Sequence, residues 1–498
     1  MYRRVYLLSL LMGSATLATA TTPVVTVTSP GTGSSVGSPV NYVASASSSA
    51  CPKGIAAMRI YTAPGVSAYT VNAGQLNTNI NLPVGSYNTV VQAGDNCGGV
   101  GKATVNVTVS KINLAPPKFL YATEFAAGRV AEYVVNPLTG AITPTSQGST
   151  WAHWGPVDIA SDPGGYRLYV ANQGLHDMDA YFIYRNTGDL FQVPGSPYAL
   201  AGVGHRVVVH PAGKFVYVSS STSSNGAITA SDINAFAVQA DGSLQPVPGS
   251  PFALSPNGLP ALAMDPKGQY LYVSASSSGA GAVAAFAING TNGALTPVPS
   301  SPFIVPVGAC NPSADFCQES PTDLAIEPTG KYLYGVLGIE SAVAGFSIDR
   351  TTGALSNLAG SPYPEQSFCS FNAFGACPYS WTESIAPNGK FIYVGDTQFN
   401  ELSIFSINQG TGALTYAGAT NAQRGICSPY TVNVDPSSTF IYSLGTTQSG
   451  CGGAGSNAVL GFSISQGNGQ LLSVPGSPFP NASVHTTDDS EEKVLVTR

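Results

Sequence analysis

The amino-acid sequence predicts an all-β protein, in which a seven-bladed β-propeller follows a small N-terminal β-sandwich. Three observations support this prediction. Only 9% of the 498 residues are charged, against about 25% in an average soluble protein, while Gly, Pro and Tyr number 56, 37 and 24. These residue types favour strands and turns over long helices. The other two observations are a set of short alternating strands near the N-terminus and a unit of about fifty residues that recurs seven times.

The first twenty residues have the order of a secretory signal peptide. The basic residues Arg3 and Arg4 precede an apolar stretch from Val5 to Leu11, and Ala18-Thr19-Ala20 supplies a small-x-small cleavage site. We therefore expect residues 1–20 to be removed and the mature protein to be secreted, periplasmic or held at the cell surface. The alternative is a buried N-terminal strand or helix. No later apolar run reaches the roughly 18 residues that span a bilayer, so we expect no membrane span.

The eight cysteines favour the same oxidising compartment, because their local spacing suits disulfide bonds. The predicted pairs, chosen to keep each bridge inside one structural unit, are Cys51–Cys97, Cys310–Cys317, Cys369–Cys377 and Cys427–Cys451. Zinc binding is the competing interpretation. No pair has the C-x2-C spacing typical of zinc sites and no His is close in sequence, so we expect neither a metal nor a cofactor.

The segment from about residue 23 to 110 reads as short strands separated by Gly, Pro and Ser turns, which suits a β-sandwich. The predicted strands are Val24 to Thr28, Val40 to Ala46, Met58 to Tyr61, Tyr87 to Gln92 and Ala103 to Val109. The stretch Thr28-Ser29-Pro30-Gly31-Thr32-Gly33 resembles the start of bacterial immunoglobulin-like modules, which serve as spacers or adhesion units. We therefore expect an immunoglobulin-like β-sandwich over 21–112 and, over 113–117, a short stiff linker.

A repeat occupies the rest of the chain, 118–498. An alternating strand with a central tyrosine recurs at Tyr121, Tyr169, Tyr217, Tyr272, Tyr334, Tyr393 and Tyr442. The fourth unit shows the parts most clearly: a strand at Ala261 to Met264, a turn at Asp265 to Gly268, strands at Tyr270 to Val273 and Val283 to Ile288, and a last strand opened by Gly293-Ala294-Leu295. Four antiparallel strands in each of seven units predict a seven-bladed propeller.

Two details of the ring remain open at this stage. The first unit lacks its inner strand, which we expect the segment from Val484 to Val496 to supply, although Lys493 to Val496 also resembles an eighth copy of the second strand. A P-G-S-P-aromatic tag closes most units, for example at Pro194 to Tyr198. Its aromatic residue is expected to pack between blades, with a ligand-binding role as the alternative.

Irregular insertions are expected on one rim of the propeller. They are Trp151 to Trp154, Ser219 to Ser231, Val305 to Ser320, Glu365 to Trp381 and Thr446 to Ser456, and all six cysteines of the propeller fall on this side. Loops ordered by short disulfides suit a binding face, because less entropy is lost on binding. Resistance to proteolysis would explain the same disulfides.

The candidate site residues lie at one end of the inner strands. Two neighbouring columns run across the blades, and either could face the central channel. The ionisable residues of these columns are Asp158, His205, Arg206 and Asp323, with Glu383 one position deeper. A His beside an Arg can polarise a carbonyl or protonate a leaving group if a carboxylate orients it. A hydrogen-bonded His and a paired Arg at a strand end would be a purely structural alternative.

The repeat from Gly258 to Phe303, with D-P-x-G-x-Y-L-Y-V followed by A-F-x-I and G-A-L-x-P-V-x-x-S-P-F, resembles the seven-bladed lactonase family, propellers related to 6-phosphogluconolactonase. The resemblance covers about 118–498 and implies a lactone hydrolase. The family's P-R-H stretch falls on Gly204-His205-Arg206, where the Arg and His types are present in swapped order.

Three further positions depart from the family pattern. The family's P-H-Q stretch falls on Pro156-Val157-Asp158, which has no His. Its D-L-G-x-D-R stretch falls on Asn172 to Met178, which keeps Gly174 and Asp177 but has no Arg, and its glutamate falls near Ser221.

Two functions follow from these observations. The first is an exported module for binding or surface recognition, which takes a small lactone, a glycan or a protein on its looped face. The second is an extracytoplasmic lactone hydrolase using His205, Arg206, Asp158 and Asp323. With 19 Lys and Arg against 26 Asp and Glu, a nucleic-acid partner is not expected. We expect a monomer.

Overall fold

The computed structural model describes residues 22–36, 40–80, 82, 85–109, 118–224, 227–254, 261–277, 280–306, 320–338, 340–365, 380–396, 400–421, 427–446, 457–480 and 492–498. The chain forms two compact units divided between Asn113 and Leu114. The described residues contain no helix with the length and apolar character needed to traverse a bilayer.

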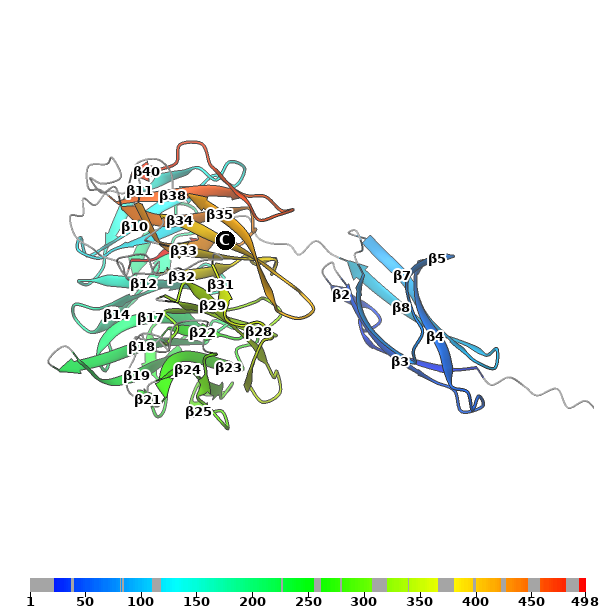
Figure 1. Cartoon of the computed structure of the whole chain (residues 1–498). Coiled ribbons are helices and arrows are strands. Elements are labelled where there is room, and N and C mark those ends of the chain that lie inside the picture. The colour runs from blue at the N-terminus through cyan, green and yellow to red at the C-terminus, as the bar shows by residue number, and fades with distance from the viewer. Residues whose placement is uncertain are drawn as a thin grey trace, which may run out of the picture. The chain divides into compact units, whose positions relative to one another are not determined.

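The N-terminal unit consists of two sheets that share one core (Figure 1). Its strands are β1 (Val24–Ser29), β2 (Ser34–Val36), β3 (Val40–Ser47), β4 (Ile55–Ala63), β5 (Val66–Val71), β6 (Gln75–Ile80), β7 (Gly85–Asp95) and β8 (Val100–Val109). One sheet has the order β1-β3-β6 and the other β2-β8-β7-β4-β5. Tyr42, Met58 and Val91 contribute fully buried side chains to the common core. All five predicted strands are confirmed, while the immunoglobulin-like assignment stays a prediction.

One predicted disulfide is confirmed in this unit. Cys51 and Cys97 are bonded, with their Cα atoms 5.7 Å apart, and they connect the segment before β4 to the turn after β7. These two thiols are therefore unavailable to a metal ion. The other three predicted pairs involve Cys310, Cys317, Cys369, Cys377 and Cys451, which lie outside the described residues, and the side chain of Cys427 is likewise not described.

Seven sheets form the second unit and confirm the all-β, seven-bladed prediction. Blade 1 consists of β9 (Phe119–Glu124), β10 (Arg129–Val135), β11 (Ile142–Trp151) and β41 (Val494–Thr497). Blade 2 consists of β12 (Pro156–Ser161), β13 (Arg167–Asn172), β14 (Asp177–Ile183), β15 (Leu190–Gln192) and β16 (Tyr198–Ala199). Blade 3 consists of β17 (Val203–Val209), β18 (Phe215–Ser224), β19 (Ala227–Val238), β20 (Leu244–Pro246) and β21 (Phe252–Leu254).

Blades 4 to 7 repeat this arrangement. Blade 4 consists of β22 (Leu262–Met264), β23 (Tyr270–Ser277), β24 (Ala280–Ile288), β25 (Leu295–Pro297) and β26 (Phe303–Ile304), and blade 5 of β27 (Asp323–Ile326), β28 (Tyr332–Leu337), β29 (Ala342–Ile348), β30 (Leu355–Asn357) and β31 (Tyr363–Pro364). Blade 6 consists of β32 (Ser380–Ile385), β33 (Phe391–Asp396), β34 (Glu401–Ile407) and β35 (Leu414–Asn421). Blade 7 consists of β36 (Cys427–Val434), β37 (Phe440–Thr446), β38 (Asn457–Ile464), β39 (Leu471–Ser473) and β40 (Phe479–Pro480).

The P-G-S-P-aromatic tags supply the short fifth strands β16, β21, β26, β31 and β40, each of which pairs with the third strand of its blade. Their aromatic residues pack in the clusters between blades, as expected: Tyr363 and Phe479 are buried, and Phe252 and Phe303 are partly buried. One expectation was wrong. The segment Ser219 to Ser231 is not an irregular loop, because β18 and β19 extend through most of it as a paired hairpin.

The described hydrophobic core of the propeller is divided into seven clusters, and each cluster joins two consecutive blades. We call these contacts the blade seams. At six seams the repeat tyrosine of one blade donates its hydroxyl hydrogen to a glycine carbonyl of the next. The pairs are Tyr121–Gly188, Tyr217–Gly293, Tyr272–Gly353, Tyr334–Gly412, Tyr393–Gly469 and Tyr442–Gly140, at 2.7–3.1 Å. The repeat tyrosine is therefore a bridge between blades as well as a core residue.

Two structural features require glycine at the seam position: a left-handed backbone conformation and close contact with the preceding blade. Gly469, for example, has a φ of +76°, and a Cβ there would lie 2.7 Å from the Phe391 ring of the preceding blade. The left-handed conformation disfavours other residues, and the close approach leaves no room for a side chain.

The seam between blades 2 and 3 departs from this pattern. Arg167 stands where the other blades have Phe or Tyr two residues before the repeat tyrosine, and the hydroxyl of Tyr169 is buried without a hydrogen-bond partner among the described residues. Phe182 instead fills the space against Gly242. The aromatic ring therefore comes from the third strand of blade 2 at this seam.

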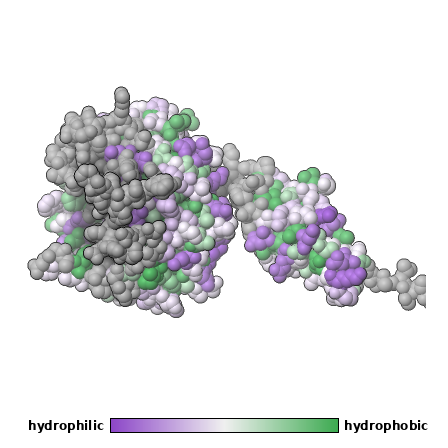
Figure 2. Space-filling model, viewed as in Figure 1, coloured by the Kyte–Doolittle hydropathy of each residue, from purple (hydrophilic) through white to green (hydrophobic). Residues whose placement is uncertain are grey.

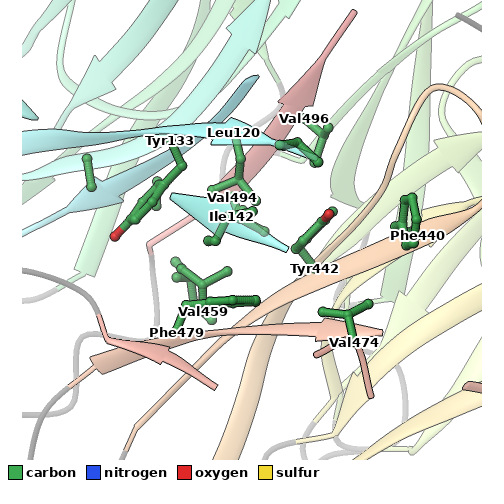
Figure 3. Close-up of a cluster of buried hydrophobic side chains, with 14 residues drawn as sticks. Leu120, Tyr133, Ile142, Phe440, Tyr442, Val459, Val474, Phe479, Val494 and Val496 are labelled. Carbon is green, nitrogen blue, oxygen red and sulfur yellow. The ribbon is translucent and has the colours of Figure 1, made fainter. Parts of the chain in front are cut away.

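The ring is closed by β41, which pairs antiparallel with β9 as the inner strand of blade 1. This settles the register that the sequence left open. Figure 3 shows the seam that results: Val494 and Val496 lie with Leu120 and Ile142 of blade 1 against Tyr442 and Val459 of blade 7. In Figure 1 the first and last blades, cyan and orange-red, lie side by side.

Candidate functional site

The seven inner strands surround a cavity of about 180 Å³ on the axis of the ring. Each inner strand contacts the next, from β41 through β12, β17, β22, β27, β32 and β36 back to β41. All seven contribute lining residues. The polar members are Asp158, Arg206, Asp323, Glu383, Ser384, Asn433 and Lys493, the last of these directly before β41. We call this space the axial cavity.

Polar side chains on the inner strands also replace missing sheet contacts. The inner strand is an edge strand of its sheet, so the backbone N–H groups on its unpaired side have no partner strand within the blade. Asp158 Oδ2 accepts a 2.7 Å hydrogen bond from Val207 N of the next blade, and Asn433 Oδ1 accepts one of 2.9 Å from Val496 N. Ser384 Oγ accepts a 3.0 Å bond from Val434 N in the same way. Part of the polarity of the cavity is therefore structural.

Two cations reach the cavity, and they differ in their contacts. Lys493 Nζ forms a 2.8 Å ion pair with Asp323 Oδ2. Arg206 makes only a long contact of 3.4 Å, from Nη1 to the carbonyl oxygen of His205, and its Nε has no hydrogen-bond partner among the described residues. Arg206 Nε is therefore a cationic donor without a described partner in this cavity.

Two acids in the cavity have pKa values above those of exposed carboxyl groups. Burial raises the pKa of Glu383 well above its usual value, and the neighbouring Asp323 raises it further, while Ala325 N–H and Lys493 oppose the shift. Neither oxygen of Glu383 has a donor in hydrogen-bonding geometry among the described residues. Burial also raises the pKa of Asp158, against the opposing charges of Arg206 and Lys493. A neutral carboxylic acid can donate a hydrogen bond or a proton to a ligand.

The structure thus brings together Asp158, Arg206, Asp323 and Glu383, but it does not place His205 among the lining residues. The strand has a bulge between Gly204 and Val207, and His205 is buried with its Nε2 2.7 Å from Ser221 Oγ. Burial and then the charge of Arg206 lower the pKa of His205 to about 4. His205 is therefore neutral at pH 7 and, in this arrangement, is bonded within its own blade.

The positions where the lactonase pattern has other polar residues are filled by apolar packing. Val157, which stands at the His of the P-H-Q stretch, is fully buried, and so is Met178, in the stretch that lacks the Arg. Both belong to the cluster between blades 2 and 3. These two positions therefore supply no polar group to the axial cavity.

Sequence reasoning missed Lys493 and Asn433 as cavity residues. Asn433 lies two residues beyond Thr431 and three beyond Tyr430, the residues of blade 7 in the two predicted columns. The one available signal for Lys493 was the alternating Lys493-Val494-Leu495-Val496 stretch, whose strand position was ambiguous.

Comparisons with known proteins support the same fold and family. The family model described as "Lactonase, 7-bladed beta-propeller" matches residues 197–311 and 318–476, more than half of the chain. A 6-phosphogluconolactonase of Pectobacterium carotovorum is 27% identical over 126 residues, which are 25% of this chain and 35% of that protein. The matched part thus spans about a third of that relative's length.

Two solved structures share the fold at low identity. A putative 6-phosphogluconolactonase from Bacteroides uniformis superposes with a TM-score of 0.59 at 17% identity, over 77% of this chain and 100% of that chain. The Pseudomonas aeruginosa periplasmic gluconolactonase PpgL gives a TM-score of 0.56 at 16% identity, over 73% and 96%.

Proposed function

The chain belongs to the seven-bladed β-propeller lactonase family, and from this premise we propose that it hydrolyses a sugar lactone in the axial cavity. The observation that carries the proposal is the placement of Glu383, a buried acid whose pKa is raised by burial, in the same cavity as the Arg206 guanidinium, whose Nε has no described hydrogen-bond partner. During lactone opening, negative charge develops first on the carbonyl oxygen and then on the departing ring oxygen. A guanidinium can stabilise the first charge, and an acid can protonate the second oxygen.

Lactone hydrolysis needs three contributions from the protein. Water attacks the carbonyl carbon, so the carbonyl oxygen gains negative charge, which the Arg206 guanidinium stabilises. The C–O bond of the ring then breaks, and Glu383 donates its proton to the departing alkoxide. The proton lost by the attacking water goes to the carboxylate of Asp323, which lies in the same cavity as Glu383. The product is a hydroxy acid, and the cavity returns to its starting state when the proton passes from Asp323 back to Glu383.

A ligand of modest size fits this space. A cavity of about 150 Å³ accommodates a six-membered ring such as benzene, and the axial cavity measures about 180 Å³. Its polar lining suits the hydroxyl groups of a single sugar ring. The relatives named gluconolactonase and 6-phosphogluconolactonase support this substrate class, and the expected signal peptide supports action outside the cytoplasm.

The test is hydrolysis of glucono-1,5-lactone by the purified full chain, corrected for the reaction in buffer. We expect Glu383→Gln and Arg206→Ala each to reduce kcat/KM by about 100-fold, the size of effect that a positioned acid or oxyanion donor has. Asp241→Asn is the matched control, because Asp241 is an exposed acid in a turn of blade 3. Its activity should equal that of the original protein.

A second candidate is favoured by the apolar filling of the lactonase positions Val157 and Met178. On this alternative the axial cavity binds a small polar ligand without turning it over, and the protein is a recognition module. Calorimetry with glucono-1,5-lactone and with gluconate separates the two. Binding without hydrolysis, lost in Arg206→Ala, would support recognition and overturn the hydrolase proposal.

A further inference from the structure

Eight of the ten large apolar side chains that the described propeller exposes lie in blades 1 and 2, and two of these are tryptophans. Trp151, at the end of β11, is 68% exposed, and Trp154, in the connection to β12, is 63% exposed. Leu175, in the turn between β13 and β14, is 57% exposed. Tryptophan is enriched at binding hot spots, because it offers a large rigid contact surface. Two exposed indoles three residues apart therefore call for a functional explanation.

Every residue from Trp151 to Gly155 makes a hydrogen bond through its main chain. Trp151 O accepts a 2.8 Å hydrogen bond from Tyr181 Oη, and Ala152 N donates to Gly128 O at 3.0 Å. His153 N donates to Asp179 Oδ2 at 2.8 Å. Trp154 O and Gly155 O accept bonds from Gly174 N and Gln173 N at 3.0 and 2.8 Å.

The Trp151 ring has an additional constraint, since the Arg129 guanidinium stacks on it at 4.0 Å from the ring centre. The indoles are therefore exposed on a rigid support and do not need to be ordered when a ligand binds. Such preorganisation reduces the entropy that binding costs.

Between the two indoles in sequence lies a polar group that is also oriented. His153 Nδ1 is 2.6 Å from Asp177 Oδ2, and Asn172 Nδ2 donates to Asp177 Oδ1 at 2.8 Å. The imidazole is 40% exposed, whereas Asp177 is nearly buried. Nδ1 is occupied by its contact with Asp177, and no described contact involves Nε2. Nε2 is therefore the ring nitrogen that can bond to a ligand hydroxyl. The site thus combines flat apolar surfaces with a directed hydrogen-bonding group.

This combination fits a pyranose better than a lipid or a nucleic acid. A gluco-configured pyranose carries its hydroxyls equatorially, so both ring faces present C–H groups that can stack on an indole, while the rim hydroxyls form hydrogen bonds. An anionic membrane or nucleic acid requires a cluster of cations, whereas this chain has 19 Lys and Arg against 26 Asp and Glu. In the view of Figure 2, hydrophilic and hydrophobic residues are interspersed over the described surface.

We propose that Trp151, His153 and Trp154 form a binding site for β-linked gluco-configured oligosaccharides, separate from the axial cavity. No residue of this site lines the axial cavity. The inference goes beyond the proposed hydrolase function and is independent of it, since it requires no turnover of a lactone.

The experiment is calorimetric titration of the oxidised full chain with cellohexaose, accompanied by tryptophan emission. We expect a Kd of about 1 mM or tighter and a change of indole emission on binding. Trp154→Ala and Trp151→Ala should each weaken binding about tenfold or more, which corresponds to about 1.4 kcal/mol. The matched control is Phe191→Ala, because Phe191 is a comparably exposed aromatic residue, 54%, on the outer strand β15.

The outcomes separate cleanly. No heat and no emission change with cellohexaose would overturn the proposal, and so would binding that survives in both tryptophan variants. Binding to phosphatidylglycerol vesicles without binding to cellohexaose would assign the indoles to a lipid surface and also overturn it. Urea unfolding of Trp154→Ala, measured on the same sample, verifies that the variant is folded, and this control does not depend on the hydrolase proposal.

Discussion

The blade seams and the axial cavity bury polar groups in opposite ways. At the seams the buried hydroxyl is paired with a glycine carbonyl, and the pairing is repeated six times around the ring. In the cavity the polar residue changes from strand to strand. Among the described residues, the Arg206 Nε has no hydrogen-bond partner, and neither oxygen of Glu383 has a donor in hydrogen-bonding geometry. Buried polar groups that recur from blade to blade with a hydrogen-bond partner indicate a scaffold. Buried polar groups that occur once and have no partner indicate a ligand-binding site.

The strongest test of this comparison uses Glu132, a fully buried acid in β10 beside the first seam. Unlike Glu383 its oxygens are both bonded, by Thr145 Oγ1 and Thr150 Oγ1. Burial still raises its pKa from 4.5 to about 7. The folded state therefore binds the proton more tightly than the unfolded state, so stability should fall as the pH rises from 4.5 to 7, by up to about 3 kcal/mol.

Urea unfolding of the original protein and of Glu132→Gln over this pH range measures the effect. We expect the difference in unfolding free energy between the two proteins to change in favour of the variant as the pH rises. Asp241→Asn is the control, because that acid is exposed and its pKa is lowered by Ser243. A pH-independent difference for Glu132→Gln would show that the seam acid is ionised throughout.

The next test breaks a seam directly. Gly469→Ala adds a Cβ 2.7 Å from the Phe391 ring at a φ of +76°, so we expect a loss of about 2 kcal/mol in unfolding free energy. Gly467→Ala in the same turn is the control, because nothing lies within 4 Å of its added Cβ. Equal stability of the two variants would mean that the seam glycines are not a requirement of the scaffold.

A smaller effect is expected from the hydrogen bond alone. Tyr272→Phe removes the 3.1 Å bond to Gly353 O and keeps the buried ring, and it should cost about 1 kcal/mol in unfolding free energy. Denaturant unfolding with an unchanged slope would show that only the hydrogen bond was lost. A cost near zero would argue that the seam hydroxyls serve packing only.

The smallest effect is expected at Tyr169. Its hydroxyl is already buried without a described partner, so Tyr169→Phe should be neutral or stabilising, by at most about 1 kcal/mol. The contrast with Tyr272→Phe is measured by the same unfolding experiment. A loss as large as that of Tyr272→Phe would reveal a partner at the exceptional seam between blades 2 and 3.

The seams could be predicted from the sequence because they are periodic. The repeat tyrosine recurs in all seven blades and a turn at the position of Asp265 to Gly268 recurs in six, so many weak signals support one another. The short strands β2, β5 and β6 were missed, since each stands alone and segments such as Gln75–Ile80 are largely polar.

The cavity could be predicted only in part. Asp158, Arg206, Asp323 and Glu383 do line it, but bulges at Pro156/Asp158 and Gly204/Val207 shift the register by amounts that the alternation of residues does not reveal. One residue of shift exchanges the two faces of a strand, and this explains why Arg206 faces the cavity while His205 bonds to Ser221. Lys493 lies directly before β41, and the sequence left it open whether Lys493 to Val496 is an inner strand or a copy of the second strand.

The pairing of β41 with β9 also constrains how the protein is made. Phe119 and Thr497 bond across a separation of 378 residues, so blade 1 stays an incomplete sheet until the last strand has been synthesised. Until then the free edge of β9 can accept the same strand from another molecule with every native contact preserved. Strand exchange between neighbouring chains is thus the misassembly to which this topology is most exposed. A cavity that contains Lys493 would then be shared between two polypeptides.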